Sequence, residues 1–282
     1  MKLVRYGERG AERPGLIDAN GALRDLSGEI EDVAPGILAP AMLNRLRGLD
    51  TDALPEVAGN PRLGVPVAGI PKIVAIGQNY LNHIKEMGYE PPAEPVIFLK
   101  AISSLSGPTD PVIKPKTSTK LDYEVEMAAI IGRTAINVSE AEALDYVAGY
   151  ALMNDGSERA FQGERAGGTT KGKSADSFGP LGPWLVTADE VPDPQNKNLW
   201  TRVNGEARQA GHTSDMVFGF AQLIAYVTEF MSLQPGDLLT TGSPHGVAAG
   251  FKPPKWLQPG DVVEMGIDGL GEQRHVIVEF PG

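Results

Sequence analysis

The 282-residue sequence contains no cysteine, which excludes disulfide bonds, thiolate nucleophiles and metal sites with cysteine ligands. Basic residues are also scarce: 25 lysines and arginines stand against 36 acidic residues, and the formal net charge is −11. Nucleic-acid binding draws on basic patches, so this composition argues against a nucleic-acid partner. The same negative charge disfavours binding to an anionic membrane surface.

Long hydrophobic runs are missing as well. No apolar stretch approaches the roughly 20 residues that a membrane-spanning helix needs. The N-terminal segment "MKLVRYGERGAERPG" lacks the apolar region of a signal peptide. We therefore expect a soluble, cytoplasmic protein with no membrane partner.

Short strand-like runs and turn residues dominate what is present, with 34 glycines and 23 prolines. "KIVAIG" predicts a buried strand, and residues 216–231 predict a core-facing helix. "LQPGDLLTTG" and "LQPGDVVEMG" each predict a turn followed by a strand. The Pro- and Gly-rich stretch "EVAGNPRLGVPVAGIP" suggests a boundary, which gives a small N-terminal domain, 1–68, and a larger domain, 69–282. The pattern predicts a mixed α/β, β-rich fold.

The segment "KLDYEVEMAAIIGR" carries an unusual set of acidic residues. Read as one strand, it places Asp122, Glu124 and Glu126 on the same face, which then turns apolar at Ala128 and Ile130. Two carboxylates about 6.6 Å apart along a strand can converge on one cation. The alternative is a solvated strand face, but such a face should stay polar. A cation that relieves the repulsion between the glutamates explains the pattern.

A third oxygen ligand is available at the end of the apolar run "YALMND". Asp155 follows Asn154 there, although Asn-Asp-Gly is also a strong turn signal. With two glutamates already in place, Asp155 completes an all-oxygen set that suits Mg²⁺, Mn²⁺ or Ca²⁺.

His83 and Glu86, in "GQNYLNHIKEMG", are spaced to be neighbours on a helical turn. A carboxylate beside an imidazole fixes its tautomer and raises its basicity, which suits a general base acting on water. The alternative is an ion pair on an exposed helix.

"GGTTKGKS" matches the phosphate-binding loop pattern, but that loop needs a strand before it and a helix after it. "RAFQGERA" precedes it and the Gly- and Pro-rich "ADSFGPLGPW" follows, so we reject a phosphate site. Lys173 in this stretch could instead reach a charged intermediate, or be an ordinary solvated lysine.

Several motifs from about residue 71 onward resemble the fumarylacetoacetate hydrolase superfamily when they are taken in order and together. They are "GQNYLNHIKEMG", "PVIFLK", "LDYEVEMAAIIGR", "VAGYALMNDGSERAFQ", "KGKSADSFGPLGPWLVTADEV", "VNGEARQ", "LQPGDLLTTGSPHG" and "PGDVVEMGIDGLG". The resemblance implies a β-roll of mixed sheets with a small N-terminal domain, in a homodimer or higher homo-oligomer.

The resemblance also implies roles for individual residues. A Mg²⁺ or Mn²⁺ ion would be held by Glu124, Glu126 and Asp155, and the catalytic residues would be His83, Glu86 and Lys173. Substrate-binding positions fall on Tyr80, Arg159, Gln162 and Ser243. This chain departs from the family pattern at Ser243, usually a threonine, and at Ala160, usually an aspartate.

Within the superfamily, "GERAGG" and "GLGEQ" look most like a subgroup that cleaves 2,4-diketo-3-deoxy sugar acids and is often labelled ureidoglycolate lyase. This resemblance implies hydrolysis of the C3–C4 bond of 2,4-diketo-3-deoxy-L-rhamnonate, or of the fuconate analogue, to pyruvate and lactate in L-rhamnose catabolism. Three alternatives stay open: an acylpyruvate or fumarylpyruvate hydrolase, an oxaloacetate decarboxylase or diacid isomerase using related enolate chemistry, and a sugar-acid binding protein without catalysis.

Overall fold

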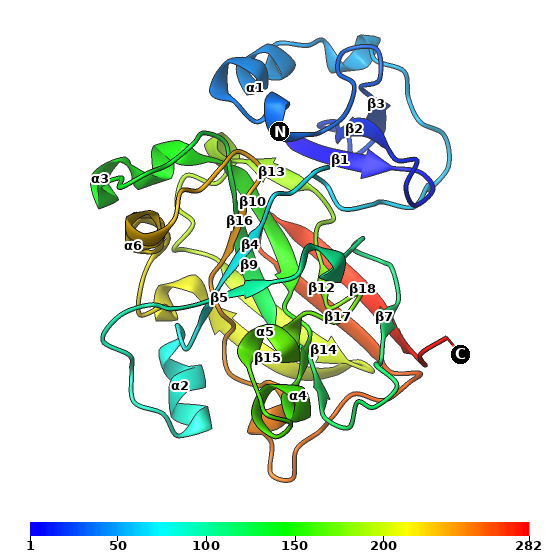
Figure 1. Cartoon of the computed structure of the whole chain (residues 1–282). Helices are drawn as coiled ribbons and strands as arrows, with labels where there is room; N and C mark the ends of the chain where they lie inside the picture. The colour runs from blue at the N-terminus through cyan, green and yellow to red at the C-terminus, as the bar shows by residue number, and fades with distance from the viewer. Residues whose placement is uncertain (282) are drawn as a thin grey trace.

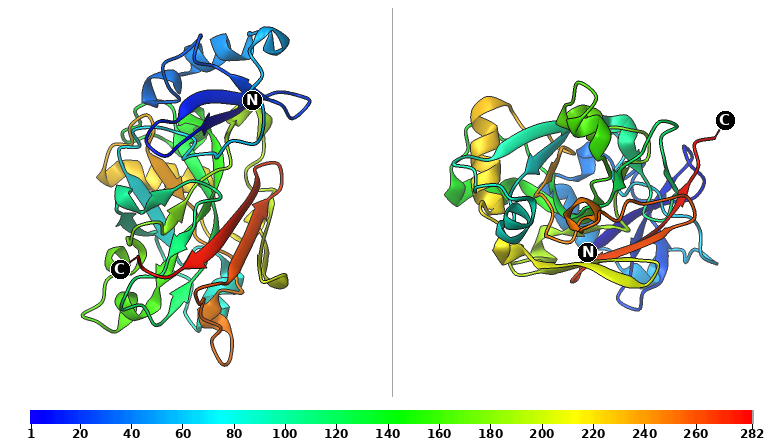
Figure 2. Two further views of the ribbon diagram at one scale, coloured as in Figure 1. Left: turned by 90° about the vertical axis from the view of Figure 1, so that its right-hand side faces the viewer. Right: turned by 90° about the horizontal axis from the view of Figure 1, so that it is seen from below.

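A computed structural model describes residues 1–281, and Figures 1 and 2 show its two main sheets from three sides. The larger sheet has nine strands in the order β3 (Leu23–Asp25), β2 (Arg13–Ile17), β1 (Lys2–Tyr6), β13 (Leu185–Thr187), β10 (Val147–Asn154), β9 (Val125–Ile131), β16 (Leu238–Thr240), β4 (Ile73–Gly77) and β5 (Val96–Lys100). The second has five, in the order β15 (Glu206–His212), β14 (Asn198–Val203), β17 (Val262–Ile267), β18 (Gly271–Val278) and β7 (Val112–Ile113).

Two short strand pairs and six α-helices, with several short 3-10 turns, complete the fold as the described residues show it. The pairs are β8 (Leu121–Asp122) with β11 (Ser157–Glu158), and β6 (Leu105–Ser106) with β12 (Gly179–Pro180). The helices are α1 (Pro40–Arg47), α2 (Leu81–Met87), α3 (Glu140–Ala143), α4 (Arg159–Gly163), α5 (Thr169–Lys173) and α6 (Phe220–Phe230). Parallel and antiparallel pairings occur in both sheets, so the predicted mixed α/β, β-rich fold is confirmed.

Strand β9 lies at the centre of the molecule, and every one of its side chains is buried. One face, which includes Met127, packs in a core shared with Met265 of the five-stranded sheet. The other face, with Ala128 and Ile130, packs in a second core with N-terminal residues such as Leu16. The face that begins with carboxylates therefore turns apolar because the N-terminal segment covers it.

The expected continuous strand over 121–131 is interrupted. The strand partner changes after Asp122. β8 ends there and pairs with β11, whereas β9 begins at Val125 and belongs to the larger sheet. The two residues between them carry no strand pairing. Because of this break, the segment contributes one strand to each of two sheets, and its carboxylates stay buried.

The N-terminal strands β1, β2 and β3 extend the larger sheet, because β1 pairs with β13. Figure 1 shows this N-terminal part, in blue, at one end of that sheet. The division of the chain at residue 68 stays a prediction.

The helix expected from periodicity over residues 216–231 is present as α6, which is confined to Phe220–Phe230. Gly219 is the N-cap of α6, and Gln222 accepts a hydrogen bond from its backbone. No helix within residues 1–281 combines the length and apolar character that crossing a membrane requires.

Strand directions bring several loops to one edge of the larger sheet. β4 and β16 are parallel, and β9 runs antiparallel to both β16 and β10. The ends of β4, β10 and β16 therefore meet the beginning of β9 at the same edge.

Candidate functional site

A cavity of about 480 Å³ opens at this edge of the larger sheet. Side chains from α2, β9, α4, α5 and the segment after β16 line it. Among them are the predicted site residues His83, Glu124, Glu126, Arg159, Gln162, Lys173 and Ser243. Residues that are up to 160 positions apart in the sequence thus share one concave surface.

Three carboxylates meet beside this cavity. One oxygen from each of Glu124, Glu126 and Asp155 lies within 4.8 Å of the other two, and all three residues are buried. Strand register creates the cluster, since Asn154 of β10 pairs with Val125 and the Asp155 amide donates to the Glu124 carbonyl at 2.8 Å. The amide of Gly242 donates to the Glu126 carboxylate at 3.2 Å.

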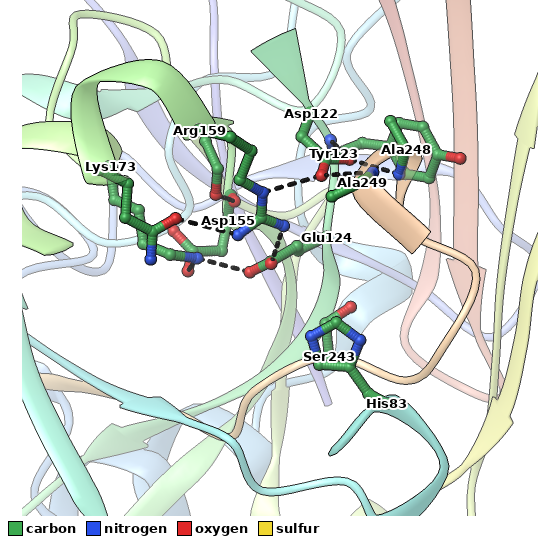
Figure 3. A network of polar contacts seen from close by, with 12 residues as sticks. His83, Asp122, Tyr123, Glu124, Asp155, Arg159, Lys173, Ser243, Ala248 and Ala249 are labelled. Atoms are coloured by element: carbon green, nitrogen blue, oxygen red, sulfur yellow. Dashed lines mark hydrogen bonds and ion pairs between the residues drawn. The ribbon is translucent and has the colours of Figure 1, made fainter. Parts of the chain in front are cut away.

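Two basic side chains contact the cluster (Figure 3). The Lys173 ammonium lies 2.5 Å from Glu124 Oε2 and 2.5 Å from Asp155 Oδ2. Arg159 donates through Nη2 to the other oxygen of Glu124 and through Nη1 to Gln162 Oε1 at 3.1 Å. Burial alone would raise the pKa of Glu124, but the charges of Arg159 and Lys173 hold that pKa well below its usual value.

Glu126 has the opposite electrostatic environment. Burial, together with the negative charges of Asp155 and Glu124, raises the pKa of Glu126 well above its usual value. A site that holds more carboxylates than it can keep ionised gains from a divalent cation. The donor set, three carboxylates and no sulfur or nitrogen, fits Mg²⁺ or Mn²⁺.

Asp155 has a second partner that the sequence reasoning missed. The Lys100 ammonium, fully buried at the end of β5, contacts Asp155 Oδ1 and donates to the Phe178 carbonyl at 3.1 Å. Burial lowers the pKa of Lys100, although Asp155 opposes that shift. The available signal was a lysine at the end of the apolar run "PVIFLK", because a buried lysine needs a partner.

The His83–Glu86 pair forms as its helical spacing predicted. Nδ1 of His83 lies 3.1 Å from Glu86 Oε2 on α2, and the Gly246 amide reaches the two Glu86 oxygens at 2.9 and 3.1 Å. The Gly246 amide therefore helps to fix the Glu86 carboxylate that contacts the imidazole. Since Nδ1 faces Glu86 and the ring lines the cavity, Nε2 is the nitrogen left for a water or substrate.

The remaining predicted residues differ in how they face the cavity. The Ser243 hydroxyl donates to the Val125 carbonyl at 3.0 Å and accepts from Gln209 at 2.8 Å, so it also braces the start of β9. Tyr80 is fully buried, and its hydroxyl has no hydrogen-bond partner within residues 1–281. A substrate-binding role for Tyr80 stays a prediction.

Residues 72–278 match the family model described as "Fumarylacetoacetate (FAA) hydrolase C-terminal". The chain belongs to the fumarylacetoacetate hydrolase family. This family and its structural neighbours are enzymes, hydrolases and isomerases among them.

Three relatives illustrate the range of this family. A Burkholderia ambifaria protein, named only provisionally as a hydrolase, is 54% identical over 97% of both chains. The structure of a probable 2-hydroxyhepta-2,4-diene-1,7-dioate isomerase from Mycobacterium abscessus has a TM-score of 0.86 and 32% identity, over 100% of both chains. The structure of maleylpyruvate hydrolase from Sphingobium sp. SYK-6, in complex with manganese(II) and pyruvate, has a TM-score of 0.81 and 30% identity, also over 100% of both chains.

Proposed function

We propose that this fumarylacetoacetate hydrolase family member is a Mg²⁺- or Mn²⁺-dependent hydrolase that cleaves the C3–C4 bond of a 2,4-diketo acid. Its proposed substrate is 2,4-diketo-3-deoxy-L-rhamnonate or the fuconate analogue, with pyruvate and lactate as products, in L-rhamnose catabolism. The observation that carries the proposal is the convergence of the His83–Glu86 pair and the carboxylate cluster on one cavity.

A divalent ion held by Glu124, Glu126 and Asp155 would act as a Lewis acid and orient the carboxylate and 2-keto oxygens of the substrate. His83, whose Nδ1 faces Glu86, is placed to take a proton through Nε2 from a water that attacks C4. The ammonium of Lys173, which lines the cavity, is the donor for the oxyanion that forms on C4.

Collapse of that oxyanion breaks the C3–C4 bond, and the bonding electron pair passes to C3 as the enolate of pyruvate. The proton that His83 removed from water then returns to C3. One water is consumed, and the products are pyruvate and a second carboxylic acid. Arg159 and Gln162, joined by a 3.1 Å hydrogen bond, are proposed to bind the substrate's polar groups.

The cavity wall supports a substrate with a short, weakly polar tail. Beyond C4, 2,4-diketo-3-deoxy-L-rhamnonate carries one hydroxyl and a terminal methyl group. The side chains of Met87, Val96 and Phe98 give the cavity an apolar wall, and Thr169 adds a hydroxyl. Such a wall suits a methyl-terminated tail better than a chain of several hydroxyls.

Two related activities remain alternatives within the same site. The manganese and pyruvate in the structure of maleylpyruvate hydrolase support an acylpyruvate or fumarylpyruvate substrate. The likeness to the probable dioate isomerase supports diacid isomerisation, or oxaloacetate decarboxylation, through an enolate without attack by water. The His83–Glu86 pair favours hydrolysis, because a base held by a carboxylate suits the activation of water.

The test is release of pyruvate from 2,4-diketo-3-deoxy-L-rhamnonate, an acylpyruvate and oxaloacetate, with Mn²⁺ or Mg²⁺ and again with chelator. We expect chelator-sensitive cleavage of the sugar acid, well above that of the other two compounds. Faster cleavage of an acylpyruvate or oxaloacetate would refute the sugar-acid assignment and keep the metal site. No turnover of any of them would refute the proposed chemistry.

We also propose that the protein forms a homodimer or a higher homo-oligomer. Sedimentation velocity of the purified protein measures this directly, and a single monomeric species would refute it.

A further inference from the structure

Asp122, the first carboxylate of "LDYEVE", is occupied entirely by hydrogen-bond donors from its own chain. Its Oδ1 accepts from the backbone amides of Tyr123, at 2.9 Å, and Ala248, at 2.7 Å. Its Oδ2 accepts from the Ala249 amide, at 3.2 Å, and from Arg159 Nε, at 2.8 Å. The side chain is 0% exposed. Four donors saturate a carboxylate, so Asp122 has no oxygen lone pair left for a cation or a substrate.

One of these four bonds, from Arg159 Nε, orients Arg159 toward the carboxylate cluster (Figure 3). Because Asp122 holds Nε, the guanidinium presents Nη2 to one oxygen of Glu124 and Nη1 to Gln162. An arginine without this anchor could turn its fork onto both oxygens of Glu124, the usual bidentate geometry. Asp122 therefore keeps the second Glu124 oxygen out of reach of Arg159.

Two of the other bonds, from the amides of Ala248 and Ala249, fix the segment 246–250, which also contacts Glu86. Asp122 accepts from two amides of this segment, and the Tyr123 hydroxyl donates to the Gly246 carbonyl at 3.0 Å. The Gly246 amide in turn donates to both oxygens of Glu86. Gly250 lies so close to Glu86 that a Cβ atom there would come within 2.3 Å of the Glu86 carboxyl group.

We propose that Asp122 is a positioning residue that fixes the His83–Glu86 pair relative to the carboxylate cluster. It does so through two arms, one through Arg159 to Glu124 and one through the segment 246–250 to Glu86. This inference rests on the proposed function, in which a water activated by His83 attacks a substrate oriented at the cluster. It assigns Asp122 neither a metal ligand's role nor a catalytic one.

The Asp122→Asn variant tests both arms. The side-chain NH₂ group of the asparagine would replace one of the two oxygens and, being a donor itself, would face the N–H donors that this oxygen accepts from. A displacement of about 1 Å costs on the order of 10²-fold in rate, so we expect kcat to fall by about that factor. We expect the Kd for Mn²⁺, measured by calorimetry without substrate, to rise about tenfold as Arg159 closes on Glu124.

A double-mutant cycle with Glu86→Gln separates positioning from a general loss of structure. If Asp122 acts through Glu86, Asp122→Asn lowers kcat much less in the Glu86→Gln background than in the wild type. Tyr123→Phe perturbs only the arm through Gly246, so we expect it to lower kcat while leaving the Kd for Mn²⁺ unchanged. This variant also keeps the test decisive if Asp122→Asn does not fold.

Asp237→Asn is the matched control. Asp237 is likewise 0% exposed and paired with a basic side chain, Lys72, but it directly precedes β16, at the edge of the sheet away from the cavity. It should lose stability without changing kcat or the Kd for Mn²⁺. If Asp122→Asn behaves like Asp237→Asn, or if its effect on kcat is additive with Glu86→Gln, the inference is wrong. If the wild type turned over no substrate, the proposed function would fail. Separately, an unchanged Kd for Mn²⁺ in Asp122→Asn would refute the arm through Arg159.

Discussion

Replacing Lys173 by methionine should strengthen metal binding and weaken catalysis at the same time. In the structure the Lys173 ammonium lies 2.5 Å from an oxygen of Glu124 and 2.5 Å from an oxygen of Asp155, two of the three proposed ligands. An arriving cation must compete with this ammonium for both carboxylates. Methionine preserves the length and packing of the side chain and removes its charge.

The size of the effect follows from the charges. Two unit charges about 4 Å apart interact by about 4 kcal/mol at an effective dielectric constant of about 20, and a divalent cation doubles this repulsion. Relaxation of the site reduces the measurable effect, yet about 1.4 kcal/mol already changes a dissociation constant tenfold. Without Lys173, Glu124 and Asp155 lose a positively charged partner in the metal-free site. A bound cation would replace that partner, which further favours metal binding. We therefore expect the Kd for Mn²⁺ to fall at least about tenfold.

Turnover should change in the opposite direction. Loss of one oxyanion donor costs about 10²–10³-fold in kcat, and saturating Mn²⁺ should not restore it. The assay combines calorimetric titration of chelator-stripped protein with pyruvate release at saturating Mn²⁺. Lys171→Met is the control, because Lys171 lies on the same short helix but is exposed. Weaker Mn²⁺ binding in Lys173→Met would show that the ammonium does not compete with the cation. Unchanged turnover would show that it does not serve the reaction.

Three further predictions test the remaining groups. His83→Ala should lower turnover by about 10²–10⁴-fold and leave the Kd for Mn²⁺ unchanged; unchanged turnover would exclude His83 as the base. Glu124→Ala should abolish Mn²⁺ binding and activity together, and an active, metal-loaded variant would contradict its assignment as a ligand. Burial lowers the pKa of His275 from 6.5 to about 4, so the unfolded state binds the extra proton first as the pH falls. The free energy of unfolding should therefore be flat above about pH 6.5 and fall by about 3 kcal/mol toward pH 4, and His275→Gln should lack this fall in denaturant titrations. The same pH dependence in both proteins would mean that the folded protein keeps His275 protonated, with its ring nitrogens on the Asp110 and Gln273 oxygens that they contact.

Local sequence patterns were sufficient where a feature depends on neighbours along the chain. The helical spacing of His83 and Glu86 predicted their contact, and α2 provides it. Two-residue alternation placed Glu124 and Glu126 together, and both contribute to the carboxylate cluster. In each case the backbone period alone determines which side chains share a face.

The sequence could not indicate which charges oppose the carboxylates. Lys100 comes from the end of β5 and contacts Asp155, which follows β10, although three other strands of the larger sheet lie between these two. Nothing in the spacing of "PVIFLK" specifies that partner. The same holds for Asp122, which alternation grouped with the two glutamates, whereas the fold gives it four donors and no access to the cavity.

The amino-acid sequence by itself determined the residue types of the site, the helical pair His83–Glu86, the pairing of Glu124 with Glu126 and the family to which the chain belongs. Only the tertiary structure decided that Lys173 lies between two carboxylates and that Asp122 meets the amide of Ala248, which is 126 residues away. The physical reason is that a buried charge must find its partner wherever the packing places one. Strand order and register bring that partner to the site, and both are set by pairings between segments far apart in the chain.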